Sequence, residues 1–74
     1  MLNKGNVYFI DQFGDYIQLA AYVEEHEAYQ VIKKFLDERK FKCHYIRTWN
    51  TLEGRKYDVG SHSEFFLWGF KNED

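Results

Sequence analysis

Three residues in a short C-terminal segment, Asp58, Ser61 and His62, have the side-chain types of a hydrolytic triad. A hydrolase would need the Ser61 hydroxyl within hydrogen-bond reach of the His62 ring, with Asp58 orienting that ring. Residues this close on a turn rarely converge in that way. The alternative is a structural turn, in which Gly60 adopts an unusual backbone angle and the hydroxyls of Ser61 and Ser63 bond to the turn. We adopt the structural interpretation, expect no catalytic residue, and keep a binding role for His62 open.

Soft metal ligands are scarce, because the sequence has one cysteine, Cys43, and three histidines. Cys43 and His44 are neighbours, and neighbours on a strand point to opposite faces, so they cannot chelate one ion together. No Cys-x-x-Cys or His-x-x-x-His spacing occurs. Gly54 and Gly60 belong to no glycine-rich phosphate loop. The sequence therefore predicts no metal, no cofactor, no internal disulfide and no enzymatic activity.

The composition indicates one small aromatic domain spanning residues 1–74. Hydrophobic residues make up 45% of the chain and aromatic residues 20%, which excludes a disordered protein. Ten basic and 12 acidic residues give a net charge of −2, unlike a strongly basic nucleic-acid binder or an acidic DNA mimic. No apolar run reaches the ~18 residues that span a bilayer, and residues 1–10 lack a signal-peptide pattern. We expect a cytoplasmic protein with no membrane partner.

Two strands and a helix are expected in the N-terminal half. Residues 6–10 and 16–23 have strand composition, and the Asp- and Gly-containing segment between them favours a hairpin loop. A helix is predicted from Glu24 to about Lys40, with Arg39 and Lys40 in its last turn. One face of the second strand should point to the core: Ile17, Leu19, Ala21 and Val23. Apolar residues at helical spacing should form the buried helix stripe: Ala28, Val31, Ile32, Phe35 and Leu36.

Three further strands are expected in the C-terminal half, at residues 41–49, 56–59 and 64–70. A loop containing Gly54 and a turn near Gly60 separate them, and residues 71–74 form a polar tail that we expect to fray. The order of elements is ββαβββ. The short hairpin connections predict an α+β fold, with a mostly antiparallel sheet of four to five strands and one helix on one face.

The width of this sheet raises a question about the aromatic residues. Five strands at ~4.8 Å spacing make a sheet ~20–24 Å wide, whereas a helix is ~10 Å across. The 7 Phe, 6 Tyr and 2 Trp cannot all face one helix, so either the sheet curls strongly or an aromatic surface is left for a partner. We predict the open surface, with Phe65 and Leu67 facing the helix. Its candidate residues are Tyr45, Trp49, His62, Phe66, Trp68 and Phe70.

A sequence pattern in the C-terminal half also suggests an origin. It consists of Tyr45-Ile46-Arg47-Thr48-Trp49, a loop with Gly54, and Tyr57-Asp58-Val59-Gly60-Ser61-His62-Ser63-Glu64-Phe65-Phe66. Together with Val7-Tyr8-Phe9-Ile10-Asp11 and Gly14-Asp15-Tyr16, it resembles small uncharacterised proteins encoded by phages and prophages of Gram-positive bacteria. The resemblance covers most of the chain and implies a phage origin and a setting in the host-cell cytoplasm. Small phage proteins of this kind often bind and block a host protein.

We therefore expect a non-catalytic protein-interaction module of phage or prophage origin that inhibits or modulates a host protein, including the class that counters host defence. Two alternatives stay open. The aromatic face would be buried against a second copy in a structural homodimer, or basic residues beside exposed aromatics would bind single-stranded nucleic acid. The basic residues in question are Lys33, Lys34, Arg39, Lys40, Lys42, Arg47, Arg55 and Lys56.

Overall fold

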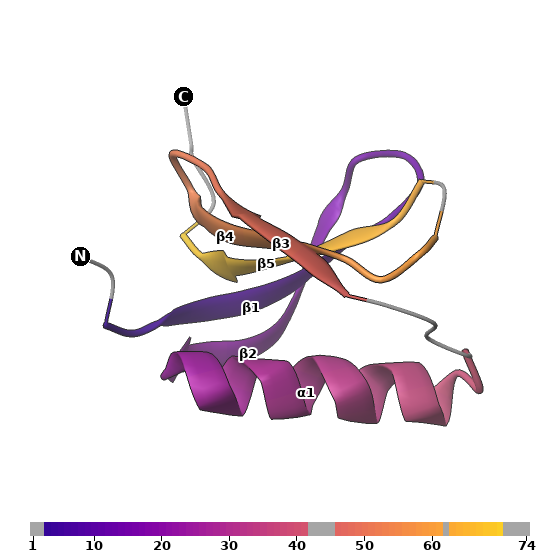
Figure 1. The fold of residues 1–74 in the computed structure, drawn as a ribbon, viewed down its shortest axis with the longest axis horizontal. Coiled ribbons are helices and arrows are strands. Elements are labelled where there is room, and N and C mark those ends of the chain that lie inside the picture. Colours follow the sequence, from indigo (N-terminus) through magenta and orange to yellow (C-terminus); the bar gives the residue numbers. More distant parts are fainter. Residues whose placement is uncertain (1–2, 42–45, 62, 71–74) are drawn as a thin grey trace.

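The computed structural model describes residues 3–41, 46–61 and 63–70. The order of elements is β1 (Gly5–Ile10), β2 (Tyr16–Val23), α1 (Glu25–Glu38), β3 (Arg47–Asn50), β4 (Gly54–Asp58) and β5 (Phe65–Gly69), as Figure 1 shows. The strands form one five-stranded sheet in the order β2-β1-β5-β4-β3, and each neighbouring pair is antiparallel. The predicted α+β class and the ββαβββ order are confirmed.

The β1–β2 hairpin turns where the sequence places Asp and Gly. The carbonyl oxygen of Asp11 accepts the Gly14 N–H at 3.0 Å, and the Asp11 N–H donates to the Asp15 carbonyl oxygen at 3.0 Å. Gly14 has a φ of +83°, which an L-residue adopts at a cost. The Asp11 carboxylate also accepts the N–H groups of Phe13 and Asp15, each at 2.9 Å. These bonds make a short loop with an Asp-stabilised turn.

Two bulges interrupt the alternation of β2. Tyr8 lies opposite Gln18, but its neighbour Val7 lies opposite Ala20, so β2 contains one extra residue there. A second irregularity lies between the Val7–Ala20 pair and the Gly5–Val23 pair. Each bulge moves the following side chains of β2 to the other face, which a strict period of two does not anticipate.

The predicted core face of β2 is therefore only half right. Leu19 and Val23 pack against the core as expected, and so does Ala20, which was assigned to the opposite face. Ile17 and Ala21 are exposed. The bulges are the physical reason, because an uninterrupted strand would have kept Leu19, Ala21 and Val23 on one side.

Helix α1 begins at Glu25, with the predicted first residue Glu24 as its N-cap, and ends before the predicted Lys40. Its start is stabilised by the Glu27 carboxylate, which accepts the Glu24 N–H at 3.3 Å. The helix ends at Glu38, and the Arg39 N–H makes a last bond to the Phe35 carbonyl oxygen at 3.2 Å. Lys40 has a φ of +56°, so the chain has already left the helix. Arg39 and Lys40 are not in the last helical turn, and this prediction was wrong.

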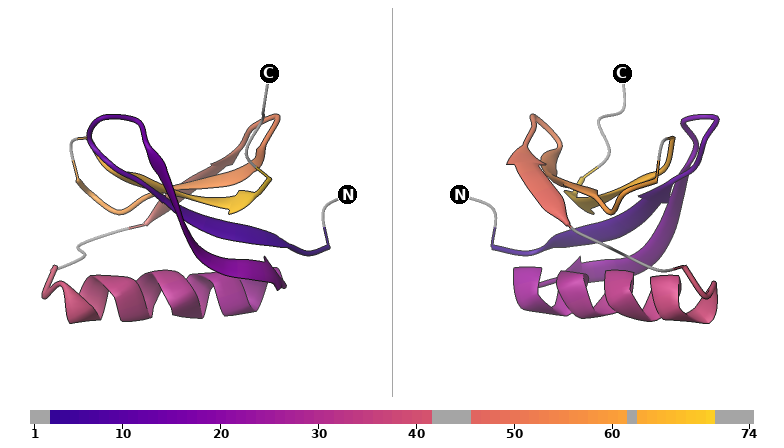
Figure 2. Two further views of the ribbon diagram at one scale, coloured as in Figure 1. Left: turned by 180° about the vertical axis from the view of Figure 1, so that it is seen from behind. Right: turned by 45° about the vertical axis from the view of Figure 1, so that its right-hand side comes forward.

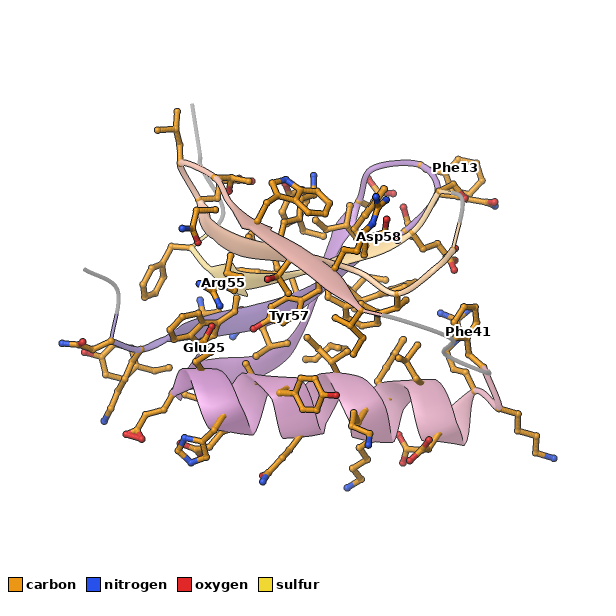
Figure 3. All side chains as sticks on the ribbon, viewed as in Figure 1. Phe13, Glu25, Phe41, Arg55, Tyr57 and Asp58 are labelled. Carbon is orange, nitrogen blue, oxygen red and sulfur yellow. The ribbon has the colours of Figure 1, made fainter. Side chains whose placement is uncertain are left out.

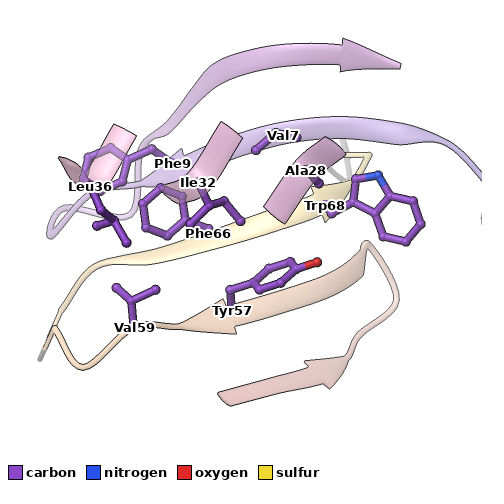
Figure 4. Packing of buried hydrophobic residues seen from close by; sticks show 9 residues of the cluster. All are labelled: Val7, Phe9, Ala28, Ile32, Leu36, Tyr57, Val59, Phe66 and Trp68. Atoms are coloured by element: carbon purple, nitrogen blue, oxygen red, sulfur yellow. The ribbon is translucent and has the colours of Figure 1, made fainter. Parts of the chain in front are cut away.

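The buried stripe of α1 packs against β1, β2 and β5. We call the cluster beneath it the main core (Figure 4). Its buried members are Val7, Phe9, Ala28, Ile32, Leu36, Tyr57, Val59, Phe66 and Trp68. Val31 and Phe35 complete the predicted stripe and are partly buried against this cluster. Phe41 also packs here, before the described part of the chain resumes at Ile46.

The two faces of β5 are the reverse of the prediction. Phe66 and Trp68 lie on the helix side and are only 1% and 6% exposed, and the Trp68 indole N–H donates to the Val23 carbonyl oxygen at 2.9 Å. Leu67 lies on the other face, with Phe65 packed nearby. The alternation of side chains along β5 correctly separates Phe66 and Trp68 from Phe65 and Leu67, but both pairs are apolar. Hydrophobicity alone therefore could not identify the set that faces α1.

The face of the sheet away from α1 is also closed. Tyr8, Ile10 and Leu67 are buried there and form what we call the second core. Tyr16 from β2 lies across it, with its ring edge-on to Tyr8 at 5.7 Å between centroids. The Tyr16 hydroxyl donates to the Glu53 carboxylate at 2.8 Å. Since β2 is at one edge of the sheet and Glu53 lies in the turn at the other, this bond joins the two sides of a strongly curled sheet (Figure 2).

Two glycines allow β4 and β5 to approach closely where they pair at Gly54 and Gly69. A side chain at Gly69 would overlap the carbonyl oxygen of Glu53, and one at Gly54 would overlap the carbonyl oxygen of Trp68. The Phe70 N–H donates to that same Glu53 carbonyl at 2.9 Å. The β3–β4 turn therefore rests directly on the end of β5, a close backbone approach that only glycine permits.

Strand β3 is shorter than predicted. Within the described residues it begins at Arg47, whereas the prediction began it at Phe41. Residues 42–45 and the expected frayed tail, 71–74, lie outside the described residues. In the part of the chain that the structure describes, no helix has the length and apolar character needed to span a bilayer.

Candidate interaction surface

The turn that resembles a triad is held by Asp58. One carboxylate oxygen accepts a hydrogen bond from the Arg47 guanidinium at 2.7 Å, and the other accepts the Gly60 N–H at 2.9 Å. The Arg47 bond, followed by the Gly60 bond, holds the pKa of Asp58 below its ordinary value. Gly60 has a φ of +96°, so its predicted unusual backbone angle is confirmed. Asp58 thus organises the turn through both oxygens.

The serine of the same turn is engaged as well. The Ser61 hydroxyl donates to the Glu64 carboxylate at 3.3 Å, and Arg39 lies 3.9 Å from the other Glu64 oxygen. His62 lies outside the described residues. The geometry at Ser61 therefore matches a structural turn, in which the hydroxyl has a carboxylate partner.

One group of metal-ligand types is found among the described residues, at the start of α1. The ligand atoms of Glu24, His26 and Glu27 lie within 4.8 Å of one another, and all three side chains are exposed. Glu27 already accepts the Glu24 N–H. Exposed acidic groups at a helix start favour the helix dipole without any ion, so this group indicates no metal centre. Cys43 and His44 lie outside the described residues.

The arginines predicted to contact nucleic acid each face a carboxylate. Arg47 binds Asp58, and Arg55 extends from β4 to Glu25 of α1 at 2.6 Å (Figure 3). Arg39 approaches Glu64 at 3.9 Å, as noted above. Pairing cancels much of the positive field that would attract phosphates. The nucleic-acid alternative stays a prediction.

The predicted aromatic surface is divided by the fold. Its two β5 residues are buried in the main core and are not available to a partner. Trp49 and Phe70 are 41% and 44% exposed. Tyr45 and His62 lie outside the described residues. Trp49 makes an edge-on contact with Phe65, whose ring centroid is 6.3 Å away, so it borders the second core while keeping one side in water.

The β3–β4 turn adds a residue that the sequence prediction missed. Leu52 stands at its tip and is fully exposed. Three hydrogen bonds hold the turn around it. The Thr51 N–H and the Thr51 hydroxyl both donate to the Gly54 carbonyl oxygen, the hydroxyl at 3.1 Å. The Gly54 N–H donates to the Thr51 carbonyl oxygen at 3.2 Å. We call Trp49, Leu52 and Phe70 the hairpin patch. The missed signal is a leucine inside a segment otherwise typical of a turn.

The other hairpin provides a reference. Phe13 projects outward from the β1–β2 loop and is largely exposed (Figure 3). It is the one large apolar residue of residues 11–15, and its neighbours in that loop are Gln12 and Gly14. The β1–β2 hairpin also carries the exposed Ile17 and Tyr22 on β2, and the β3–β4 hairpin carries or adjoins Trp49, Leu52 and Phe70.

Comparison with protein-family models, curated proteins and solved structures finds no match to this chain. The candidate surface is therefore supported by its own geometry. The resemblance to phage proteins, based on the motifs in the sequence, stays a prediction.

Proposed function

We propose that the protein is a non-catalytic interaction module of phage or prophage origin that binds a host protein through the hairpin patch. The observation that carries this proposal is Leu52, a fully exposed apolar side chain on a turn with a fixed backbone. A residue held in this way loses little conformational freedom when it enters a partner's pocket.

The neighbours of Leu52 have the composition of a binding site. Interface centres are enriched in aromatic residues and arginine, and a few such side chains contribute most of the binding energy. Trp49 on β3 and Phe70, whose N–H bonds to the Glu53 carbonyl oxygen of the turn, supply exposed aromatic groups. The Lys56 ammonium lies 5.3 Å from the Phe65 ring centroid and adds a positive group next to Trp49. A host protein with an apolar pocket and an acidic rim fits this surface.

Binding in place of catalysis is supported by the C-terminal turn. Asp58 and Ser61, the described members of the triad-like segment, use their polar groups to hold the turn. An inhibitory or modulating role, and the host cytoplasm as its setting, rest on the resemblance to small phage proteins.

The test compares the two hairpin tips. Tagged full-length protein is incubated with lysate of a Gram-positive host, and captured proteins are quantified for wild type, Leu52→Asp and Phe13→Asp. Both substitutions place a carboxylate at an exposed tip, so circular dichroism should show that both variants fold. We expect Leu52→Asp to lose at least tenfold of the captured partner and Phe13→Asp to retain it.

Two results would overturn the proposal. If Leu52→Asp captures the same partner as wild type, the hairpin patch is not the binding surface. If wild type captures no protein above a tag-only control, the protein is not a host-binding module.

A further inference from the structure

Strand β2 is an edge that neither charge nor proline protects. It lies at the end of the sheet opposite β3. Its sequence, YIQLAAYV, contains no charged residue and no proline. Edge strands in monomeric proteins are typically short or carry Lys, Pro or other charges that prevent pairing with another chain. Strand β3 fits that pattern, because it has four residues and begins with Arg47.

An apolar groove runs beside this edge. It has a volume of about 280 Å³ and is lined by Leu19 of β2 and by Val31, Lys34, Phe35 and Glu38 of α1. The three apolar side chains are partly buried at most, and the two charged ones have opposite signs. We call β2 with this groove the β2 seam.

Ile17 continues the apolar surface of the seam. It lies opposite Phe9 of the main core, so it belongs to the helix side of the sheet, yet about half of its surface is exposed. An isoleucine in this position gains burial when a second strand lies alongside.

We propose that the β2 seam is the interface of a homodimer, in which β2 strands of two copies pair antiparallel and join the two sheets. In a twofold dimer, the same surface of each copy faces that surface on the other copy. Because β2 carries no charge, such pairing creates no like-charge contact between the strands. Lys34 and Glu38 differ in sign, so each Lys34 can meet a carboxylate of the second copy across the axis. Because the β2 seam is complementary to itself, a second copy of the chain is the partner that fits it best.

The bulges of β2 limit the extent of the pairing. The regular part of the strand comes before the first bulge and is centred on Ile17. Bulges twist an edge away from a neighbouring strand. Pairing over this short stretch, with the groove beside it, gives a dimer that dissociates on dilution. A 74-residue domain is small enough to gain stability from such association.

The dimer is independent of the proposed function and has a consequence for it. The hairpin patch lies on the β3–β4 turn and around it, so pairing through β2 uses none of its residues. One dimer then presents two binding surfaces, which raises the apparent affinity for a partner that is itself multivalent.

Sedimentation equilibrium of the full chain over a wide concentration range tests this interface. Wild type should show a monomer–dimer equilibrium. Ile17→Lys should weaken it at least tenfold, whereas Thr48→Lys, the same charge at the opposite edge, should leave it unchanged. A wild-type protein that is monomeric at all concentrations, or equal effects of Ile17→Lys and Thr48→Lys, would overturn the proposal.

A charge reversal provides a second test that does not depend on a change in the strand. Lys34→Glu should weaken dimerisation several-fold, and adding Glu38→Lys in the same chain should restore it. Both positions are exposed on α1, so the variants should fold even if Ile17→Lys does not. Failure of the double variant to restore the dimer would contradict the proposed contact. Monomeric variants should still capture a host partner through Leu52, which separates this proposal from the proposed function.

Discussion

The two faces of the sheet are buried by different means. On one face, α1 covers the main core and supplies Ala28, Ile32 and Leu36 to it. On the other face no helix is present in the described residues, and the sheet closes over the second core by its own curl. A small domain can therefore bury aromatic residues on both faces with one helix. High aromatic content by itself does not indicate an open binding face.

Strand β5 shows the comparison most clearly, because consecutive residues enter the two cores. Trp68 and Phe66 lie under the helix, and Leu67 lies under Tyr16. We therefore expect substitutions under the helix to lower the free energy of unfolding the most. The loss caused by a substitution in the second core should depend on whether the curled sheet can relax around it.

The largest effect is expected for Trp68→Glu. It removes a buried ring, which costs about 3–5 kcal/mol, and leaves an unpaired buried charge. Together these approach the whole stability of a small domain. Circular dichroism should show an unfolded chain. The matched variant Trp49→Glu should remain folded, since Trp49 is at the exposed edge; a folded Trp68→Glu protein would mean that the main core is misassigned.

Truncations in β5 compare the two cores directly. Phe66→Ala should lower the free energy of unfolding by about 3–5 kcal/mol and Leu67→Ala by about 2–3 kcal/mol, as measured by urea denaturation. The smaller loss reflects a smaller cluster that can partly collapse around the cavity. A loss below about 0.5 kcal/mol for Leu67→Ala, typical of surface positions, would show that the second face is open to water.

The close contact of Gly69 with the β3–β4 turn gives the next effect. Gly69→Ala places a methyl group against the Glu53 carbonyl oxygen, and only backbone atoms surround it. Overpacking of this kind should cost about 1–3 kcal/mol. In Gly14→Ala the methyl group meets open space, so only the positive φ is penalised, by about 1 kcal/mol. Equal shifts in the melting temperature of the two variants would show that steric contact does not explain the glycine at position 69.

The smallest effect concerns the bond between the two sides of the curl. Burial, followed by the hydrogen bond and the charge of Glu53, raises the pKa of Tyr16 to about 12. Because the folded state keeps the proton that the unfolded state loses near pH 10, this stabilisation is complete below pH 10 and is lost as pH rises through 12. Tyr16→Phe should cost about 0.5–1.5 kcal/mol at neutral pH.

The pH profile provides the control for this bond. Between pH 10 and 12 the stability of Tyr16→Phe should fall less steeply than that of wild type. Some dependence should remain, because burial also raises the pKa of Tyr57. Identical slopes for the two proteins in urea melts would contradict the assigned role of Tyr16.

Local signals in the sequence predicted most of the elements. The Asp11–Asp15 loop, the α1 stripe and the positive φ at Gly60 each follow from residues a few positions apart. Long-range features could not be predicted in this way. The bulges of β2 and the contact between Gly69 and Glu53 depend on how strands meet, and the choice of face for β5 depends on where α1 docks.

The candidate site shows the same division. Trp49 and Phe70 were identified as surface aromatics, but Leu52 was missed because a turn residue is usually assigned to the loop and not to a binding surface. Phe66 and Trp68 were assigned to the surface because both faces of β5 are apolar and the wrong one was expected to meet α1. The opposite face, with Leu67, is not open either, because the sheet curls over it.

The most direct test of the curled sheet is the solvent accessibility of its second face in solution. Methyl NMR signals of the full chain are recorded with a soluble paramagnetic relaxation agent. Leu67 and Leu52 provide an internal comparison, since one is fully buried and the other fully exposed. The structure predicts strong relaxation of the Leu52 methyl groups and protection of the Leu67 methyl groups equal to that of Val7 in the main core. Relaxation of Leu67 as strong as that of Leu52 would contradict it.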